Sequence, residues 1–360
     1  MRDIWYLVLP LIISALITPV VKQIGYRLDA FAQMNERTVH HGKIVRIGGV
    51  AIYLAFIITM ALYVKTDMAM NGILIGSTIM FIGGLVDDLV NLKPLYKFSF
   101  QVVAAIVLIA SGVTLDVIRL PLGITINMGV VSFIVTFFWI TGITNAVNLI
   151  DGLDGLCGGI SVIILTVIAM LAVIEGRGDV EMIALILVGA TLGFLIYNAH
   201  PASIFMGDCG ALFLGFIISA ISLLGFKSST IMTLALPLLL LALPIIDTLS
   251  AILRRTLKGH KFSEADKSHI HHLLMNKFGH KNTVIIMCIV TALFGLTAYI
   301  YMINKGIGLI SLFVIMLAVD LFIEGSGMIS DKYHPILSVS RRIIRRLTRK
   351  KTINDSDRTN

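Results

Sequence analysis

The chain has 360 residues, of which 57% are hydrophobic and only 14% are charged, and its mean hydropathy is +0.93. A soluble globular domain carries about 25% charged residues, so this composition excludes one and predicts a protein embedded in a lipid bilayer. The net charge of +8 suits a membrane protein facing anionic headgroups, and nucleic acid is not needed as a partner to explain it.

Apolar runs of about 17 to 25 residues, each long enough to cross the hydrocarbon core of a bilayer, recur along the whole chain. We identify eleven such runs: 4–24, 47–65, 70–86, 98–114, 129–147, 157–175, 180–198, 209–226, 229–252, 283–303 and 307–325. Backbone groups in lipid must be hydrogen-bonded within the chain, so each run is expected to be a helix. The sequence predicts an all-α polytopic membrane protein. Residues 1–326 form one transmembrane bundle and residues 327–360 a basic cytoplasmic tail, amphipathic and then disordered.

The distribution of Lys and Arg predicts the orientation of the bundle. Segments that follow odd-numbered runs carry 23 of the 29 basic residues. By the positive-inside rule these segments face the cytoplasm, which places the N-terminus outside and the C-terminus inside. On the outer face, residues 119–129 alternate apolar side chains around Gly123, a pattern that predicts a short hairpin.

Four polar segments follow odd-numbered runs and are therefore all predicted on the cytoplasmic side. The first is Asp87–Asp88, at the end of the third run. These residues are either ordinary charges at a helix terminus or a carboxylate pair that shares protons or binds a cation. A hard cation such as Mg²⁺ prefers oxygen ligands and often takes one or two carboxylates together with substrate phosphates.

The second polar segment, NAVNLIDGLDGL, places Asn145, Asn148, Asp151 and Asp154 three residues apart at a membrane edge. A charged side chain there is costly, about 2.5 to 3.5 kcal/mol per Asp at a helix centre, so such residues are functional candidates. The glycines that follow predict that the helix ends near Asp151 and that a turn comes next. A capping loop would need one such side chain rather than four, so the segment indicates chemistry.

The third polar segment, YNAHPASIFMGDCG, contains Asn198, Phe205 and Asp208. Asp208 also suits the role of N-cap for the run that follows it, and Phe205 also suits a place in the core. Both interpretations stay open at this level.

The fourth polar segment, FSEADKSHIHHLLM, carries His269, His271 and His272 and is preceded by Arg254 and Arg255. A zinc site is one alternative, but three His within four residues rarely complete a tetrahedral site alone. A solvated polar loop is another. We favour a cationic cradle for phosphate, because basic and imidazole donors suit several phosphate oxygens.

Together, GLVDDLVNL, NAVNLIDGLDGL, the FMGD element and ADKSHIHHLLM resemble the polyprenyl-phosphate N-acetylhexosamine-1-phosphate transferases. These motifs occur in the order typical of that superfamily, and its eleven-span topology matches as well. The HIHH form and its run-up resemble the WecA/TagO branch, which uses UDP-GlcNAc. One departure is Val45-Arg46-Ile47-Gly48-Gly49, where the family commonly has Pro in place of Val45. Arg46 and both glycines remain, so we keep Arg46 as a substrate contact.

The resemblance implies a reaction at the cytoplasmic face of the bacterial cytoplasmic membrane. GlcNAc 1-phosphate would move from UDP-GlcNAc to undecaprenyl phosphate, giving undecaprenyl-diphospho-GlcNAc and UMP, with Mg²⁺ or Mn²⁺ as cofactor. This would be the first membrane step of a cell-envelope polysaccharide or teichoic acid pathway. UDP-MurNAc-pentapeptide or another UDP-HexNAc remains open as the donor, as does a homodimeric state.

The resemblance also implies a role for each candidate residue. Asp87 resembles the base or orienting group for the lipid phosphate, with Asp88 beside it. Asp208 resembles the principal metal ligand, supported by Asn148 and by Asp151, which also counts as catalytic. The remaining positions would contact the donor: uridine would be held by Asp154, Asn198 and Phe205, and the diphosphate and sugar by His269, His271 and His272, with Arg254 and Arg255 nearby.

The competing class is an ion-coupled transporter, for which acidic residues within a membrane are equally natural. A transporter is expected to place charges near the middle of its spans and to show broken helices or repeated halves. Here the acidic residues lie at span ends, and the sequence shows no halved repeat, so we favour the enzyme.

Overall fold

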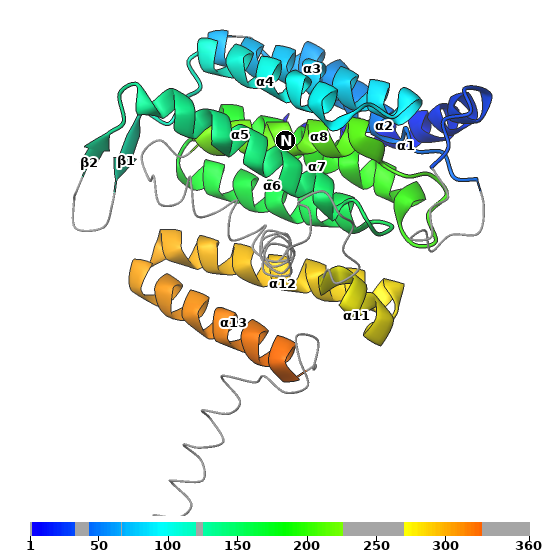
Figure 1. Cartoon of the computed structure of the whole chain (residues 1–360). Coiled ribbons are helices and arrows are strands. Elements are labelled where there is room, and N and C mark those ends of the chain that lie inside the picture. The colour runs from blue at the N-terminus through cyan, green and yellow to red at the C-terminus, as the bar shows by residue number, and fades with distance from the viewer. Residues whose placement is uncertain (1, 33–42, 66, 120–124, 226–269, 326–360) are drawn as a thin grey trace, which may run out of the picture.

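The computed structural model describes residues 2–32, 43–65, 67–119, 125–225 and 270–325 (Figure 1). In these ranges the chain is almost entirely helical. The helices are α1 (Arg2–Arg27), α2 (Gly49–Tyr63), α3 (Met68–Val90), α4 (Pro94–Ala110), α5 (Val131–Ile150), α6 (Leu156–Ile174), α7 (Gly178–Asn198), α8 (Gly207–Gly225), α11 (Ile270–Phe278), α12 (His280–Ile303) and α13 (Lys305–Gly325).

Ten of the eleven predicted runs each coincide with one helix, and the run 229–252 lies outside the described residues. Seven of the helices (α1, α3, α5, α6, α7, α8 and α12) are long and apolar enough to cross a membrane, while α2, α4 and the apolar part of α13 are shorter. The expectation of a helical, multi-pass membrane protein is confirmed. The total of eleven crossings and the orientation of the termini stay predictions.

Helix α8 forms the centre of the bundle. Every residue from Cys209 to Gly225 is buried, and the helix packs against α3 and α5. Small residues permit close helix packing in a bilayer, and Gly84 of α3 is such a residue. A Cβ added at Gly84 would lie 2.5 Å from the carbonyl oxygen of Asp208. This close crossing brings the end of α3 against the beginning of α8.

The remaining helices lie on either side of this centre. Helix α7 packs against α1 and α6, while α12 packs against α6 and α13. Figure 1 shows α12 and α13 as a layer below α6, with the short α11 at one end of that layer. The C-terminal helices thus rest on the same bundle that contains the predicted motifs.

The two ends of α5 are marked by different structures. Before it, β1 (Val117–Arg119) pairs antiparallel with β2 (Thr125–Asn127), which confirms the pairing expected for residues 119–129. After it, Asp151 is the C-cap and Gly155 has a φ of +73° just before α6. The predicted helix end near Asp151 and the glycine-dependent turn are therefore also confirmed.

Candidate functional site

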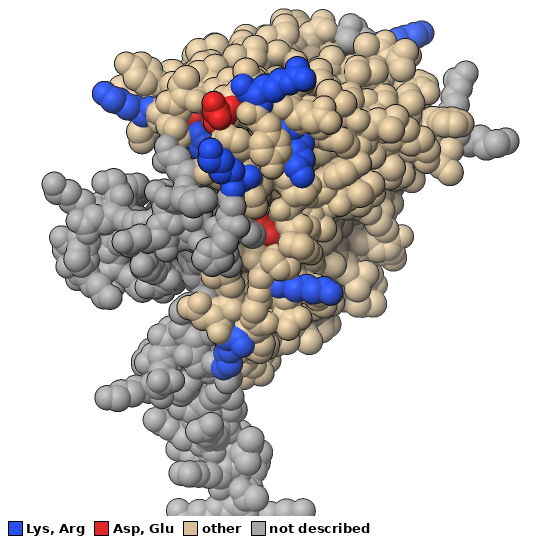
Figure 2. Space-filling model, turned by 90° about the vertical axis from the view of Figure 1, so that its right-hand side faces the viewer, with Lys and Arg blue, Asp and Glu red and all other residues tan. Residues whose placement is uncertain are grey.

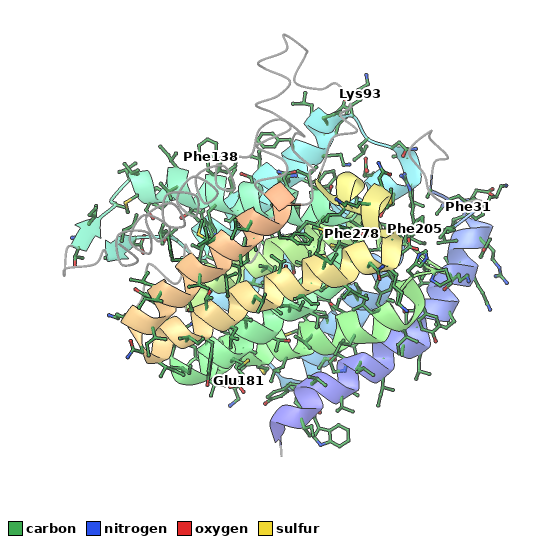
Figure 3. The ribbon with its side chains drawn as sticks, turned by 90° about the horizontal axis from the view of Figure 1, so that it is seen from below. Phe31, Lys93, Phe138, Glu181, Phe205 and Phe278 are labelled. Carbon is green, nitrogen blue, oxygen red and sulfur yellow. The ribbon has the colours of Figure 1, made fainter. Side chains whose placement is uncertain are left out.

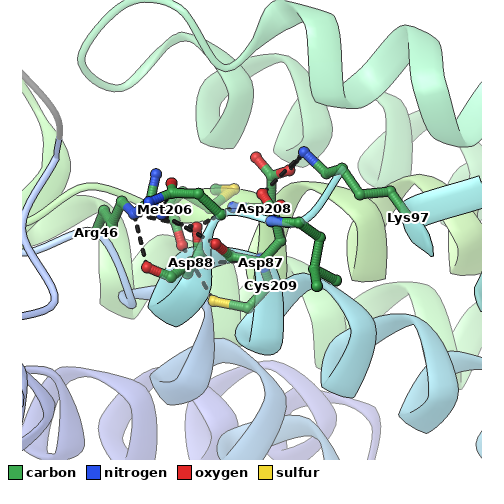
Figure 4. Close-up of polar contacts among 9 residues, drawn as sticks. Arg46, Asp87, Asp88, Lys97, Met206, Asp208 and Cys209 are labelled. Atoms are coloured by element: carbon green, nitrogen blue, oxygen red, sulfur yellow. Dashed lines mark hydrogen bonds and ion pairs between the residues drawn. The ribbon is translucent and has the colours of Figure 1, made fainter. Parts of the chain in front are cut away.

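Three carboxylates from separate motifs meet where α3 ends and α8 begins. Asp87 and Asp88 come from the last turn of α3, and Asp208 comes from the first turn of α8. One oxygen atom from each lies within 4.8 Å of the other two, a grouping that suits a metal ion. Figure 4 shows Asp87, Asp88 and Asp208 together with Arg46 and Lys97.

Asp88 anchors the N-terminus of α8. Its Oδ1 accepts a hydrogen bond from the backbone N–H of Asp208 at 3.0 Å, and its Oδ2 accepts one from Cys209 at 2.9 Å. The first N–H groups of a helix have no partner within the helix, and a carboxylate is a strong acceptor for them. Because Asp88 binds these groups, the Asp208 carboxylate is not needed as the cap of α8 and is directed to the other charges.

The turn before Asp208 requires glycine. Gly207 has a φ of +72°, a conformation that residues with a Cβ rarely adopt. A Cβ at this position would also overlap the carbonyl oxygen of Arg46 and the carboxylate of Asp88. The glycine of the FMGD element therefore permits close contact among three segments that are distant in sequence.

Lys97 is the basic partner of this acidic group. Its Nζ lies 2.8 Å from Oδ2 of Asp87 and is also ion-paired with Asp208. The other Asp87 oxygen accepts a hydrogen bond from the N–H of Leu92 at 2.7 Å. From the sequence, Lys97 counted only toward the topology. The available signal was its place in the first turn of α4, which starts at Pro94 shortly after the acidic pair.

Arg46 reaches the same end of α3 from the loop before α2. Backbone hydrogen bonds fix that loop against the FMGD segment, from Phe205 N–H to the oxygen of Val45 at 2.8 Å and from Gly48 N–H to the oxygen of Phe205 at 2.9 Å. The Arg46 guanidinium then donates to the backbone oxygens of Asp88 at 2.8 Å and Asp87 at 3.0 Å. A positive charge at the C-terminal end of α3 interacts favourably with the negative end of the helix dipole.

Asp151 belongs to the same acidic group by its electrostatics. Burial, and then the negative charges of Asp208 and Asp88, raise the pKa of Asp151 to about 8, although the N–H of Gly207 favours its charged form. Asn148 lies nearly one turn earlier on α5. Its buried Nδ2 has no hydrogen-bond partner within the described residues, and an amide's nitrogen and oxygen can be exchanged by a flip. Asp151 thus lies close to the acidic group, and Asn148 offers an amide nitrogen, unpaired among the described residues, on the preceding turn of α5.

The positions predicted to hold uridine lie in the adjoining turns. Asn198 is buried, accepts a hydrogen bond from Gly155 N–H at 3.1 Å and donates to the oxygen of Ile204 at 2.9 Å. It therefore joins the turn before α6 to the loop before α8, and its contact with a ligand stays a prediction. Phe205 is partly buried. Figure 3 shows Phe205 and Phe278 at one end of the bundle, away from Glu181.

Asp154 lies in a second group that contains two histidines. Its buried carboxylate accepts a hydrogen bond from the N–H of Ala202 at 3.1 Å, and the same Oδ2 lies 2.8 Å from Nδ1 of His200. The His200 ring stacks on the ring of His280, with centroids 4.2 Å apart and planes inclined by 20°. His280, the first residue of α12, was not predicted from the sequence, because nothing in its local pattern places α12 beside Asp154.

Several predicted residues lie outside the described part of the chain. Arg254, Arg255 and His269 are among them, as is the tail 327–360. The backbones of His271 and His272 belong to α11, and their side chains are not described. On the face drawn in Figure 2, the described residues are mostly uncharged, with acidic and basic side chains in small groups.

The helices define a multi-pass membrane protein, and the acidic group at one end of its bundle could hold a metal ion. Residues 70–226 match the sequence family described as glycosyl transferase family 4. The chain is 37% identical to a probable undecaprenyl-phosphate N-acetylglucosaminyl 1-phosphate transferase from Bacillus subtilis, across 94% of this chain and 96% of that protein. The chain belongs to glycosyl transferase family 4, in its polyprenyl-phosphate N-acetylglucosamine 1-phosphate transferase branch.

More distant relatives span two activities. A decaprenyl-phosphate N-acetylglucosaminephosphotransferase from Mycobacterium tuberculosis is 32% identical over 77% of this chain and 76% of its own length. A phospho-N-acetylmuramoyl-pentapeptide-transferase from Streptococcus uberis is 30% identical over 63% of this chain and 74% of its own length. The resemblance drawn from the motifs is confirmed at the level of the family.

Proposed function

We propose that this protein transfers GlcNAc 1-phosphate from UDP-GlcNAc to undecaprenyl phosphate, releasing UMP. An oxygen of the lipid phosphate forms a new bond to the sugar-bearing phosphorus, and the bond from that phosphorus to UMP breaks. The observation that carries this proposal is the group of Asp87, Asp208 and Lys97, joined by ion pairs at the end of α3. Phosphoryl transfer depends mainly on positioning and charge neutralisation, and this group offers both signs of charge.

A divalent cation, Mg²⁺ or Mn²⁺, fits the acidic residues of this group. Asp208 would be the principal ligand, and Asn148 and Asp151 would support it. The fit is supported by three carboxylates within 4.8 Å and by the buried Asn148 amide with no partner among the described residues. When bound, the cation would neutralise charge on the diphosphate. Oxygen ligands of this kind suit Mg²⁺ and Mn²⁺ better than they suit softer metals.

Asp87 and Lys97 would act on the acceptor. The Asp87 carboxylate would accept a proton from the lipid phosphate or orient it, and Lys97 would hold a phosphate oxygen in place of one of its present carboxylate partners. Asp88, with both oxygens bound to the start of α8, would keep Asp208 in position. The division of roles follows from how many contacts each carboxylate already makes.

The donor would lie along the adjoining turns. Asp154 and Phe205 would contact the uracil, Asn198 would hold the turns that carry them, and Arg46 would lie near the phosphates. His269, His271 and His272, with Arg254 and Arg255, would face the diphosphate and sugar. The active site would open to the cytoplasm, where basic residues gather by sequence, and a homodimer is compatible with this arrangement.

The rival donor is UDP-MurNAc-pentapeptide, since relatives with that activity also match part of the chain. The family relationship over nearly the full length of the chain favours UDP-GlcNAc. The test of the proposal is the product itself: purified protein with UDP-GlcNAc and undecaprenyl phosphate should yield a lipid diphospho-sugar and one UMP for each lipid consumed. Free sugar phosphate without a lipid product would contradict it.

A further inference from the structure

The group of Asp154, His200 and His280 lies beside the proposed active site and makes contacts of its own. The three residues come from the turn before α6, the loop before α8 and the start of α12. Asp154 and His280 are mainly buried, with 1% and 8% of their side chains exposed, while 36% of the His200 side chain is exposed. Buried polar groups of this kind are expected to have specific partners.

The geometry of the group suits hydrogen bonding better than metal binding. The separation of 2.8 Å between His200 Nδ1 and Asp154 Oδ2 is a normal hydrogen-bond distance. Imidazoles bind a metal through lone pairs that lie in the plane of the ring. The rings of His200 and His280 are stacked within 20° of parallel, so their lone pairs lie in separate planes and do not converge on one ion.

The contacts form a chain from α12 to the carboxylate. Nδ1 of His200, protonated in the tautomer that this contact requires, donates to Asp154, and the N–H of Ala202 donates to the same oxygen. His280 packs on the face of His200 at 4.2 Å and limits the rotation of that ring. Its own Nε2 lies 3.9 Å from Asp154. These contacts orient the Asp154 carboxylate. Because a carboxylate can accept about four hydrogen bonds, they are also compatible with a further donor from the ligand.

We propose that His200 and His280 are positioning residues that set the orientation of the Asp154 carboxylate toward the nucleobase of the donor. This inference rests on the proposed function, in which Asp154 contacts uracil. The uracil ring has an imide N–H that can donate a hydrogen bond to a carboxylate, whereas cytosine has a hydrogen-bond acceptor at that position. Helix α12, which lies outside the central bundle, therefore contributes to the affinity for the uridine nucleotide.

The test compares variants that separate the hydrogen bond from the ring stack. His200→Phe keeps an aromatic ring beside His280 and loses the donor. His200→Asn places an amide N–H near the position of Nδ1 and loses the ring. His280→Ala loses the stack, and His280→Phe keeps it. Thr291→Val, which removes a hydroxyl bond within α12, is the control for general damage to that helix.

The measured quantities are the Kd for UMP, by calorimetry on protein in detergent, and the separate KM values for UDP-GlcNAc and undecaprenyl phosphate. His200→Phe should weaken UMP binding by about tenfold or more, and His280→Ala by about fivefold. His200→Asn, His280→Phe and Thr291→Val should stay within about threefold of wild type. The KM for undecaprenyl phosphate should not change in any variant, a pattern that general loss of structure would not produce.

Two results would overturn the inference and can be told apart from each other. If wild type binds UMP and transfers sugar phosphate, but His200→Phe and His200→Asn have equal UMP affinity, the positioning role is wrong and the proposed function stands. If wild type neither binds UMP nor forms the lipid product, both proposals are wrong.

Discussion

The substitution Asp88→Asn separates an anchoring carboxylate from a ligand carboxylate. Asp88 is buried and accepts hydrogen bonds from two consecutive N–H groups at the start of α8. Asn keeps one acceptor oxygen but turns its NH₂ group toward the other N–H, so one bond is lost and two donors face each other. Hydrogen bonds to charged groups contribute about 1.5 to 3 kcal/mol each.

We therefore expect Asp88→Asn to lower stability by about 2 to 4 kcal/mol, with the repulsive contact included. At about 2 to 4 °C per kcal/mol for larger domains, the melting temperature should fall by about 4 to 16 °C. The assay is thermal unfolding of purified protein in one detergent, followed by size-exclusion chromatography. Asp208→Asn is the matched control, because that side chain is half-buried and ion-paired but does not cap α8.

The Asp208→Asn protein should keep its melting temperature within about 2 °C, yet lose transfer by about 100-fold or more, the usual effect of removing one electrostatic contact in an active site. An Asp88→Asn protein that melts like wild type, while losing activity as Asp208→Asn does, would refute the assignment of Asp88 as the anchor.

Four further predictions concern a competing charge, a titrating carboxyl group, the backbone and the topology. Lys97→Met should tighten Mg²⁺ binding by about tenfold, since a competing cation leaves Asp87 and Asp208, while transfer falls; weaker metal binding, measured by calorimetry, would count against the ion-pair geometry. With a pKa of about 8, Asp151 is mostly protonated at pH 7, so metal binding should release a proton. Below pH 8 the affinity for the metal should therefore increase as the pH rises, by up to about tenfold per pH unit; a pH-independent Kd would remove Asp151 from the site. Gly207→Ala should abolish folded protein in chromatography, because of its φ of +72° and the overlap with Arg46 and Asp88. In intact cells an impermeant maleimide should label Asn127→Cys but not Lys93→Cys, both exposed positions, and the reverse pattern would invert the topology.

The helices and the ends of α5 could be predicted from the sequence because both depend on local patterns. Apolar runs of bilayer length set the helices, and the glycines after Asp151 set the turn. The sequence also marked Asp87, Asp151 and Asp208 as candidates, because charge at a membrane edge is costly; the structure brings their carboxylates together, and their role in the reaction stays a prediction.

The partners of those residues could not be predicted, because they depend on how separate helices cross. Asp88 was paired with Asp87 in sequence, yet it binds the start of α8, 120 residues away. Asn198 was assigned to the nucleoside, and in the structure its side chain joins two backbone turns. Lys97 lies in the first turn of the helix after the acidic pair, but that position does not reveal which carboxylates it meets. His280 carried no local pattern that places it beside Asp154.

The central claim is tested most directly by donor choice in a purified system. Protein in detergent is given undecaprenyl phosphate with either radiolabelled UDP-GlcNAc or radiolabelled UDP-MurNAc-pentapeptide, with Mg²⁺ or with a chelator, and the label extracted into organic solvent is counted. We predict lipid-extractable label from UDP-GlcNAc alone, and only with Mg²⁺. Label from UDP-MurNAc-pentapeptide, or from UDP-GlcNAc in the presence of chelator, would contradict the proposed donor or the proposed metal.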